Sequence, residues 1–335
     1  MQSTDCSIHI TNHESEQALA SAVKNISISV LVPAYNEEKG IGNVIQGFRQ
    51  AIPYAEIFVY DNNSSDRTAE KAGEMGAIVR QEHRQGKGYV VRRMFADIDS
   101  DVYILVDGDN TYDPRMAQTL VEILITNGLD MINCARIPTT ATAYRPGHKF
   151  GNNLLSGIVK TIFGNQFQDL LSGYRVFSRR FVKSFPVMAT GFDIETELTV
   201  HALSLEMPAM EIPCNFQNRL DGSESKLHTF SDGFRILLTI ANLLRQERPL
   251  AVFSTVSLLL CAMSLILGYP LIETYLQTGL VPRFPTALLT TGLLLGASLS
   301  MACGLILDTV TRGRQEAKRL AYLAIPGILG KSRPS

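Results

Sequence analysis

Residues 102–114 read VYILVDGDNTYDP and join an apolar run to a cluster of carboxylates. The run Val102–Val106 predicts a buried β-strand, because a short uninterrupted set of apolar, partly β-branched side chains is typical of one. Asp107 and Asp109 follow it directly. Two carboxylates this close repel each other unless a cation or hydrogen-bond donors neutralise them. The stretch therefore predicts a polar site at the end of a buried strand.

The same pattern recurs along the chain and predicts alternating strands and helices. Strands are expected at residues 26–32, 56–60, 77–80, 102–106, 131–135, 172–177 and 209–214. Helices are expected between most of them, including 88–98, 146–163 and 195–205. This alternation predicts an α/β, Rossmann-like domain with a mostly parallel sheet. Ligands of such sheets bind beyond the carboxyl ends of the strands, so the polar segments 33–38, 61–68 and 107–113 should meet at one edge.

Carboxylates with a neighbouring hydroxyl at the end of a strand are typical of a site for a hard divalent cation. Mg²⁺ or Mn²⁺ prefers oxygen ligands and commonly joins one or two carboxylates to the phosphates of a substrate. The candidate metal ligands are Asp109, Asp107 and Thr111. An isolated Asp-x-Asp also occurs in turns and helix caps, so the metal interpretation depends on its position after a strand of the α/β pattern.

Four motifs in this order resemble those of inverting glycosyltransferases of family 2, which have the nucleotide-sugar-binding GT-A fold. They are VPAYNE at 32–37, DNNSSDRT at 61–68, GKG at 86–88 and DGD at 107–109. Two later segments, DLLSGYR at 169–175 and RLDGSESK at 219–226, resemble the polyprenyl-phosphate (dolichol-phosphate) branch of the family. The likeness covers residues 26–248, and the C-terminal pair of apolar segments also recurs in bacterial members of that branch.

The resemblance implies a role for each matching position. Pro33, Tyr35 and Glu37 would line the nucleoside pocket, and Asp61 would bond the base or ribose. Lys87 would lie near the nucleotide, Asp107 would hold the ribose or sugar, and Asp109 would bind a metal that bridges the diphosphate. Arg136 and Lys149 would receive the lipid phosphate. Arg219, Ser225 and Lys226 would close over the donor phosphates, so that the implied catalytic residues are Asp107, Asp109, Arg219 and Lys226.

The chain departs from the family pattern at two places. Thr111 stands where the family often has Gln, and the loop that ends at Lys226 is one residue longer than the commoner form, which leaves open whether Ser223 or Ser225 is the match. Other interpretations also stay open. Arg136 could pair with a surface carboxylate, and Asp193 or Glu195 could be a catalytic base, as other family-2 enzymes have in this region, or a helix cap.

Two segments near the C-terminus, 249–272 and 284–307, carry no charged side chain. Each exceeds the roughly 20 residues needed to cross the hydrocarbon core of a membrane. Basic residues flank them: Arg245, Arg248, Arg312, Arg314, Lys318 and Arg319, against Glu316. Lys and Arg collect on the cytoplasmic side of spans, so a hairpin with a cytoplasmic catalytic domain in the cell membrane is expected. The first 25 residues show no basic start and apolar run of a signal peptide.

These features predict five parts. They are a polar N-terminal tail (1–25), a GT-A catalytic domain (26–229), an amphipathic interfacial helix (230–248), two transmembrane helices (249–310) and a basic cytoplasmic tail (311–335). The 31 Lys+Arg and 32 Asp+Glu give a net charge of −1, which argues against nucleic acid as a partner. Five cysteines in no paired spacing predict neither disulfides nor a zinc site. The oligomeric state stays open, a homo-oligomer included.

The expected reaction follows from the acceptor. A sugar hydroxyl must lose a proton to attack an anomeric carbon, whereas a lipid phosphate is already anionic and needs only positioning and charge shielding. We therefore expect metal-dependent, inverting transfer from a UDP- or GDP-linked sugar to a membrane polyprenyl phosphate. One alternative is a family-2 transferase that acts on a sugar hydroxyl. Processive synthases of that kind usually carry a Gln-x-x-Arg-Trp motif, and this chain contains no tryptophan. Another is a non-catalytic membrane module that binds nucleotide sugars.

Overall fold

The computed structural model describes residues 26–138, 166–191, 193–217, 242, 245 and 247–328. The chain divides into two compact units, one formed by Met1–Leu227 with Ala321–Ser335 and the other by His228–Leu320. The predicted helix at 146–163, the loop at 219–226 and most of the predicted interfacial helix lie outside the described residues. Each unit is considered by itself.

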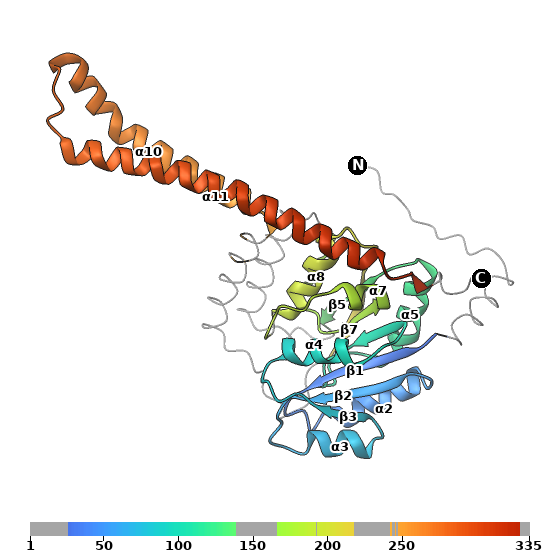
Figure 1. The fold of residues 1–335 in the computed structure, drawn as a ribbon. Helices are drawn as coiled ribbons and strands as arrows, with labels where there is room; N and C mark the ends of the chain where they lie inside the picture. The colour runs from blue at the N-terminus through green and yellow to red at the C-terminus, as the bar shows by residue number, and fades with distance from the viewer. Residues whose placement is uncertain are drawn as a thin grey trace. The chain divides into compact units, whose positions relative to one another are not determined.

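The first unit is built on a seven-stranded sheet with the order β3-β2-β1-β4-β6-β5-β7 (Figure 1). Its strands are β1 (Ile28–Ala34), β2 (Glu56–Asp61), β3 (Ile78–Gln81), β4 (Val102–Leu105), β5 (Met131–Pro138), β6 (Arg175–Ser178) and β7 (Ala209–Phe216). The helices are α2 (Ile41–Ala51), α3 (Thr68–Glu74), α4 (Lys87–Asp97), the 3₁₀ helix η1 (Pro114–Met116), α5 (Ala117–Thr126), α7 (Arg179–Ser184) and α8 (Ile194–Ser204). The predicted α/β fold with a mostly parallel sheet is confirmed.

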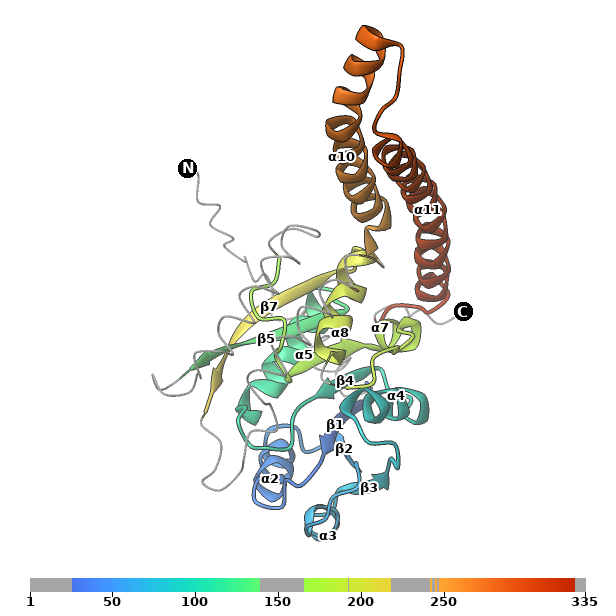
Figure 2. The same ribbon diagram turned by 90° about the vertical axis from the view of Figure 1, so that its left-hand side faces the viewer.

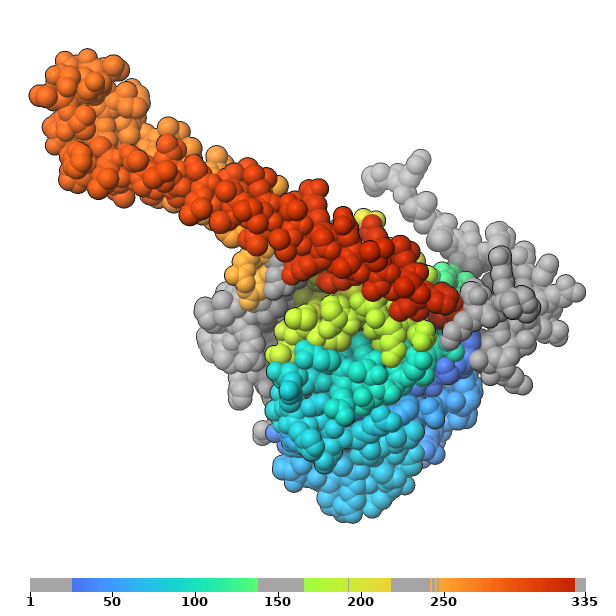
Figure 3. Space-filling view, viewed as in Figure 1, coloured from blue at the N-terminus to red at the C-terminus, as the bar shows by residue number. Residues whose placement is uncertain are grey.

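The central strands are apolar on both sides because helices cover both faces of the sheet (Figures 1 and 2). On one face, Val30 and Val32 of β1 belong to a cluster with the buried sides of α2 and α5. On the other face, aromatic rings dominate. Phe95 of α4 meets Phe177 of β6 edge to face at 6.0 Å, and Phe177 stacks on Phe181 of α7 at 4.6 Å. Figure 3 shows the segment from β1 to α4 packed as one continuous body, blue to cyan.

Strand β6 corrects the sequence-based picture of this sheet. The expected strand at 172–177 begins only at Arg175, and it runs antiparallel between β4 and β5. Leu105 pairs with Arg175, and Asn133 of β5 pairs with the same residue from the other side. An apolar run does not show which neighbour a strand pairs with. A second difference is the short helix α7, which the sequence reading did not predict; the hydroxyl of Ser178 caps it by accepting from the Phe181 N–H at 3.2 Å.

The second unit contains the helix α10 (Pro249–Thr278) and all but the last three residues of the helix α11 (Phe284–Leu323). Their most apolar windows have mean hydropathies of 2.4 and 1.8, and only 6% and 11% of those windows is buried. A core helix of a soluble protein would be mostly buried, so the exposure favours helices that face lipid. The helices contact each other through small polar residues. Ser257 donates to the Ala297 carbonyl and Ser264 to the Thr290 carbonyl, both at 2.8 Å.

Candidate active site

The loops after β1 and β2 are hydrogen-bonded together at the carboxyl edge of the sheet, as predicted. The Asn36 N–H donates to Ser64 Oγ at 2.9 Å, and the Glu37 N–H donates to Thr68 Oγ1 at 2.9 Å. The loop after β4 joins them, because a Cβ at Gly40 would lie 2.9 Å from the Gly108 carbonyl oxygen. This distance is shorter than real Cβ contacts, so the approach of the two backbones requires glycine at position 40.

Each of the three loops turns through an asparagine in the left-handed region. The φ angles are 51° at Asn36, 63° at Asn63 and 59° at Asn110. Asparagine tolerates this conformation better than most other residues with side chains. The sharp turns reverse the chain immediately after each strand, which keeps the polar side chains of the loops at the edge of the sheet.

Asp61 ends β2 in a buried position, with 2% of its surface exposed. Its Oδ2 accepts from the Ser64 N–H at 3.1 Å. Its Oδ1 is buried and has no hydrogen-bond partner among the described residues. Leaving a buried acceptor unsatisfied costs stability, so a ligand N–H or O–H that reached Oδ1 would gain a strong hydrogen bond.

Asp109 is oriented by the residue two positions on. Its Oδ1 accepts from the Thr111 hydroxyl at 2.6 Å and from the Thr111 N–H at 3.2 Å, and both residues are buried. Among the described residues, no group of three or more His, Cys, Asp or Glu side chains is placed to hold a metal ion. A divalent cation bound through one or two carboxylates and a substrate's phosphates does not need such a group. The ligand role of Thr111 stays a prediction.

Lys87 bridges two carboxylates beneath these loops. Its Nζ lies 2.5 Å from Asp107 Oδ1 and 2.5 Å from Glu195 Oε1, and the side chains of Lys87 and Glu195 are 9% and 7% exposed. Burial alone would lower the pKa of Lys87, but the two carboxylates outweigh it and raise that pKa, so the ammonium stays charged. Burial raises the pKa of Glu195, against the opposing effect of Lys87. Its Oε2 has no hydrogen-bond partner in the described part of the chain.

The glycines beside Lys87 let another segment pack over the start of α4. A Cβ at Gly86 would lie 2.1 Å from the Thr190 carbonyl oxygen, and one at Gly88 would lie 2.3 Å from that of Ala189. The carboxylate of Glu197 fixes the same segment by accepting from the Ala189 N–H at 2.7 Å. The Gly-Lys-Gly motif is thereby explained by close contact with the segment that leads into α8.

The DLLSGYR segment packs against the carboxylate of Asp107, which also pairs with Lys87. A Cβ at Gly173 would lie 2.0 Å from Asp107 Oδ2. Arg175, fully buried, fixes the loop by donating from Nε to the Ser172 carbonyl at 3.1 Å and from Nη2 to the Leu170 carbonyl at 2.8 Å. Burial lowers the pKa of Arg175 to about 10, which leaves the guanidinium charged at neutral pH.

Arg136 lies on β5 and forms a two-pronged ion pair with Asp169. Nε donates to Oδ2 and Nη2 to Oδ1, both at 2.7 Å, and the guanidinium lies 5.6 Å from the centre of the Phe216 ring. Burial would raise the pKa of Asp169, but the bonds from Arg136 outweigh it and lower that pKa. Arg136 therefore pairs with a carboxylate, as one interpretation of the sequence allowed. That carboxylate, Asp169, is buried and not on the surface.

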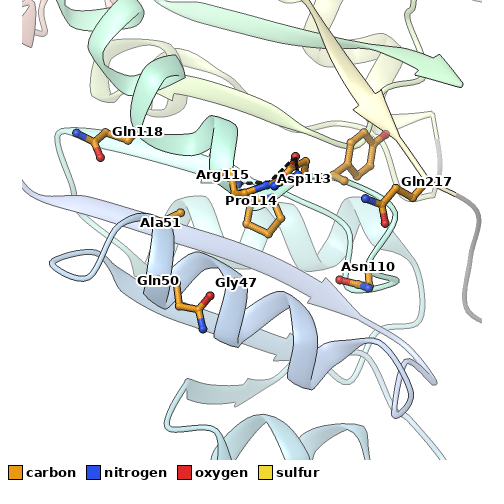
Figure 4. A pocket seen from close by; sticks show the side chains of 10 residues that line it. Gly47, Gln50, Ala51, Asn110, Asp113, Pro114, Arg115, Gln118 and Gln217 are labelled. Atoms are coloured by element: carbon orange, nitrogen blue, oxygen red, sulfur yellow. Dashed lines mark hydrogen bonds and ion pairs between the residues drawn. The ribbon is translucent and has the colours of Figure 1, made fainter. Parts of the chain in front are cut away.

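A cavity of about 520 Å³ is lined by residues of α2, of η1 and of the loop between β4 and η1. In Figure 4, Asn110 and Gln217 lie at one end of this cavity and Gln118 at the other. Neither Asp107 nor Asp109 lines it. The cavity reaches this loop at Asn110 rather than at the carboxylates of Asp107 and Asp109, so we do not assign it to the donor.

The structure brings together most of the sequence-predicted residues that it describes. Tyr35, Glu37, Asp107, Asp109 and Thr111 belong to the three loops, Pro33 and Asp61 lie at the ends of β1 and β2, and Lys87 contacts Asp107. Arg136 lies on β5, which β6 separates from β4. Lys149, Arg219, Ser225 and Lys226 lie outside the described residues. Sequence reasoning gave no role to Asp169 and left Glu195 ambiguous. Asp169 lies in the DLLSGYR motif, but a sequence motif does not show which residue elsewhere in the chain each of its side chains contacts.

Residues 29–185 match the family model described as glycosyl transferase family 2. The chain carries a glycosyltransferase family 2 domain. Two relatives come from Haloferax volcanii. Glycosyltransferase AglJ is 29% identical over 89% of this chain and 98% of that protein. A dolichyl-phosphate hexose transferase is 26% identical over 66% of this chain and 95% of that protein.

A solved structure with the same fold is glucosyl-3-phosphoglycerate synthase from Mycobacterium tuberculosis, in complex with Mn²⁺, UDP and glucosyl-3-phosphoglycerate. It is 23% identical, has a TM-score of 0.55, and the match covers 70% of this chain and 86% of that one. At this identity the likeness shows the GT-A-like fold alone. As a family-2 member, the protein is a glycosyltransferase with this fold and two helices long and apolar enough to cross a membrane.

Proposed function

We propose that this glycosyltransferase moves a sugar from a nucleotide sugar to a membrane polyprenyl phosphate, with inversion at the anomeric carbon. The observation that carries the proposal is the state of Glu195. This residue is the buried carboxylate in the region where a hydroxyl-activating base would lie, and it is tied to Lys87 at 2.5 Å. Lys87 opposes protonation of Glu195 through Oε1, although burial raises the pKa of this carboxyl and its Oε2 has no hydrogen-bond partner among the described residues. A phosphate acceptor needs no base, whereas a sugar hydroxyl would need one.

The donor half of the site rests on the three loops. The unpartnered Oδ1 of Asp61 would accept a hydrogen bond from the base or ribose. Pro33, Tyr35 and Glu37 would line the nucleoside pocket beside it. Asp107, held between Lys87 and Gly173, would hold the ribose or the sugar.

The carboxylates fit a divalent cation. Asp109 is oriented through Oδ1 by Thr111, and the side chain of Asp107 is 30% exposed with its Oδ1 held by Lys87, so the candidate ligand atoms are Oδ2 of each carboxylate. When bound there, Mg²⁺ or Mn²⁺ would neutralise charge that develops on the diphosphate leaving group. Arg219 and Lys226 would add positive charge to the same group, and Ser225 a hydrogen bond, which is electrostatic stabilisation of the transition state.

The acceptor half comprises Arg136 and Lys149. A guanidinium binds two phosphate oxygens at once, which would direct the third toward the anomeric carbon. The lipid of a polyprenyl phosphate requires a membrane, and α10 and α11 have the length and exposed apolar surface to enter one. We propose that they form a two-span hairpin with the catalytic domain on the cytoplasmic side.

A reconstituted transfer assay tests the proposal. The purified full-length protein in phospholipid vesicles would receive polyprenyl phosphate and a panel of UDP- and GDP-linked sugars, one at a time. Formation of a lipid-linked sugar together with one equivalent of nucleoside diphosphate is expected for at least one donor. Transfer to sugar-hydroxyl acceptors, with no transfer to polyprenyl phosphate from any donor, would refute it.

A further inference from the structure

The residue that holds Arg136 is itself firmly anchored. The backbone carbonyl of Asp169 accepts from Asn133 Nδ2 at 2.7 Å, and its N–H donates to Glu211 Oε2 at 3.1 Å. Its Oδ1 also accepts from the Leu171 N–H at 3.2 Å. The carboxylate is 8% exposed. Asp169 therefore cannot swing away without breaking bonds to β5, β7 and its own loop.

Asp169 contacts both the side chain and the backbone of Arg136. Besides the two bonds from the guanidinium, Oδ2 accepts from the Arg136 N–H at 3.1 Å. The Phe216 ring lies against the guanidinium. A planar group bonded along one edge and in contact with a ring has its plane and its direction fixed, because rotation about the side-chain torsions would break both bonds.

We propose that Asp169 is a positioning residue for the acceptor: it holds the Arg136 guanidinium in the orientation that binds the phosphate of the lipid. This inference rests on the proposed function. Asp169 occupies the Nε and Nη2 edge of the guanidinium, so the lipid phosphate would be bound along the other edge. Its negative charge also offsets that of Arg136, so the pair selects the phosphate by geometry more than by net charge.

The first test compares acceptor and donor kinetics. Asp169→Asn keeps the shape and one oxygen but weakens the two-pronged bond. It should lower kcat/KM for polyprenyl phosphate about tenfold, the lower end of the loss expected for a charged hydrogen bond. The KM for the nucleotide sugar should change by less than about twofold. Asp99→Asn is the matched control, because it breaks the exposed pair with Arg179, in which Asp99 is 63% exposed, and should leave both constants unchanged. Unchanged acceptor kinetics in Asp169→Asn would overturn the inference.

The second test asks whether Asp169 acts through Arg136. In Arg136→Ala, guanidinium ions at concentrations too low to denature the protein should restore part of the transfer, because Asp169 still offers its two-pronged acceptor. The same ions should not restore Arg136→Ala/Asp169→Asn. Equal rescue of both variants would contradict a positioning role, and the Tm of each variant shows whether the double variant is folded, so that loss of folding is not counted as loss of rescue. Full activity of Arg136→Ala with polyprenyl phosphate would instead refute the proposed acceptor site, a result distinct from failure of the Asp169 inference.

Discussion

Replacing Lys87 with methionine tests the buried cluster on which the site is built. The change removes one ammonium and leaves Asp107 and Glu195 facing each other across a buried space. At an effective dielectric constant of about 20, charges 2.5 Å apart attract by roughly 6–7 kcal/mol, much of which offsets desolvation. Removal of one partner from a buried pair typically costs about 3–5 kcal/mol. For a unit of this size that corresponds to a fall in Tm of roughly 6–20 °C.

The assay is thermal unfolding of four proteins: wild type, Lys87→Met, Glu195→Gln and the double variant. Glu195→Gln in the Lys87→Met background should restore part of the lost stability, because it removes the unpaired buried charge and leaves only Asp107, which is partly exposed. A coupling of about 0.5–3 kcal/mol is expected for residues in contact.

Lys71→Met is the matched control. Lys71 pairs with Glu38 at 3.0 Å, but the two side chains are 35% and 31% exposed, so its loss should cost no more than about 1 kcal/mol. If Lys87→Met were as mild as Lys71→Met, or if the double variant showed no coupling, the buried cluster would not be the structural centre of the site.

Three further predictions concern the metal, the membrane and pH. Asp109→Asn should lower transfer more than about a hundredfold while the protein stays folded and inserted. Excess chelator should lower transfer by metal-stripped wild type to a similar extent. Undiminished turnover in chelator would exclude the metal role. Gln277→Cys and Gln315→Cys, each in a background without native cysteines, should react with an impermeant thiol reagent from opposite sides of the membrane. Gln315→Cys should react from the cytoplasmic side. Labelling of both variants from one side would refute the hairpin. Although burial raises the pKa of Asp169, Arg136 lowers it below its usual value, so the pair should stabilise the fold above about pH 4 and lose that effect as the pH falls further. The Tm difference between wild type and Asp169→Asn should then narrow from pH 7 to pH 3, and a constant difference would contradict the assignment.

Local sequence patterns were sufficient for the parts of the fold that depend on one segment at a time. The strand before Asp107 is buried as its apolar run predicts, and the loops after β1 and β2 meet because parallel strands end at one edge. The two apolar segments lie within helices of 30 and 40 residues, so each helix is longer than its apolar segment. The antiparallel placement of β6 was not predictable in this way, because strand order depends on contacts between distant segments.

The same distinction applies to the candidate site. Asp107 and Asp109 are two positions apart in the sequence, so the pair is recognisable from the sequence alone. The link between Lys87 and Glu195 joins residues 108 positions apart, and that between Arg136 and Asp169 joins residues 33 apart. Neither link has a periodic signal, and each became visible only when the chain was folded.

The measurement that tests the acceptor most directly is transfer to polyprenyl phosphate compared with transfer to polyprenol, the same lipid without the phosphate. Wild type and Glu195→Gln, each freshly purified in vesicles, would be given a labelled nucleotide sugar that supports turnover. Wild type should glycosylate polyprenyl phosphate and not polyprenol. Glu195→Gln should keep the preference for the phosphate, with activity reduced only as far as the Lys87 cluster is disturbed. Transfer to polyprenol that depends completely on Glu195 would show a hydroxyl acceptor with a catalytic base and contradict the lipid-phosphate assignment.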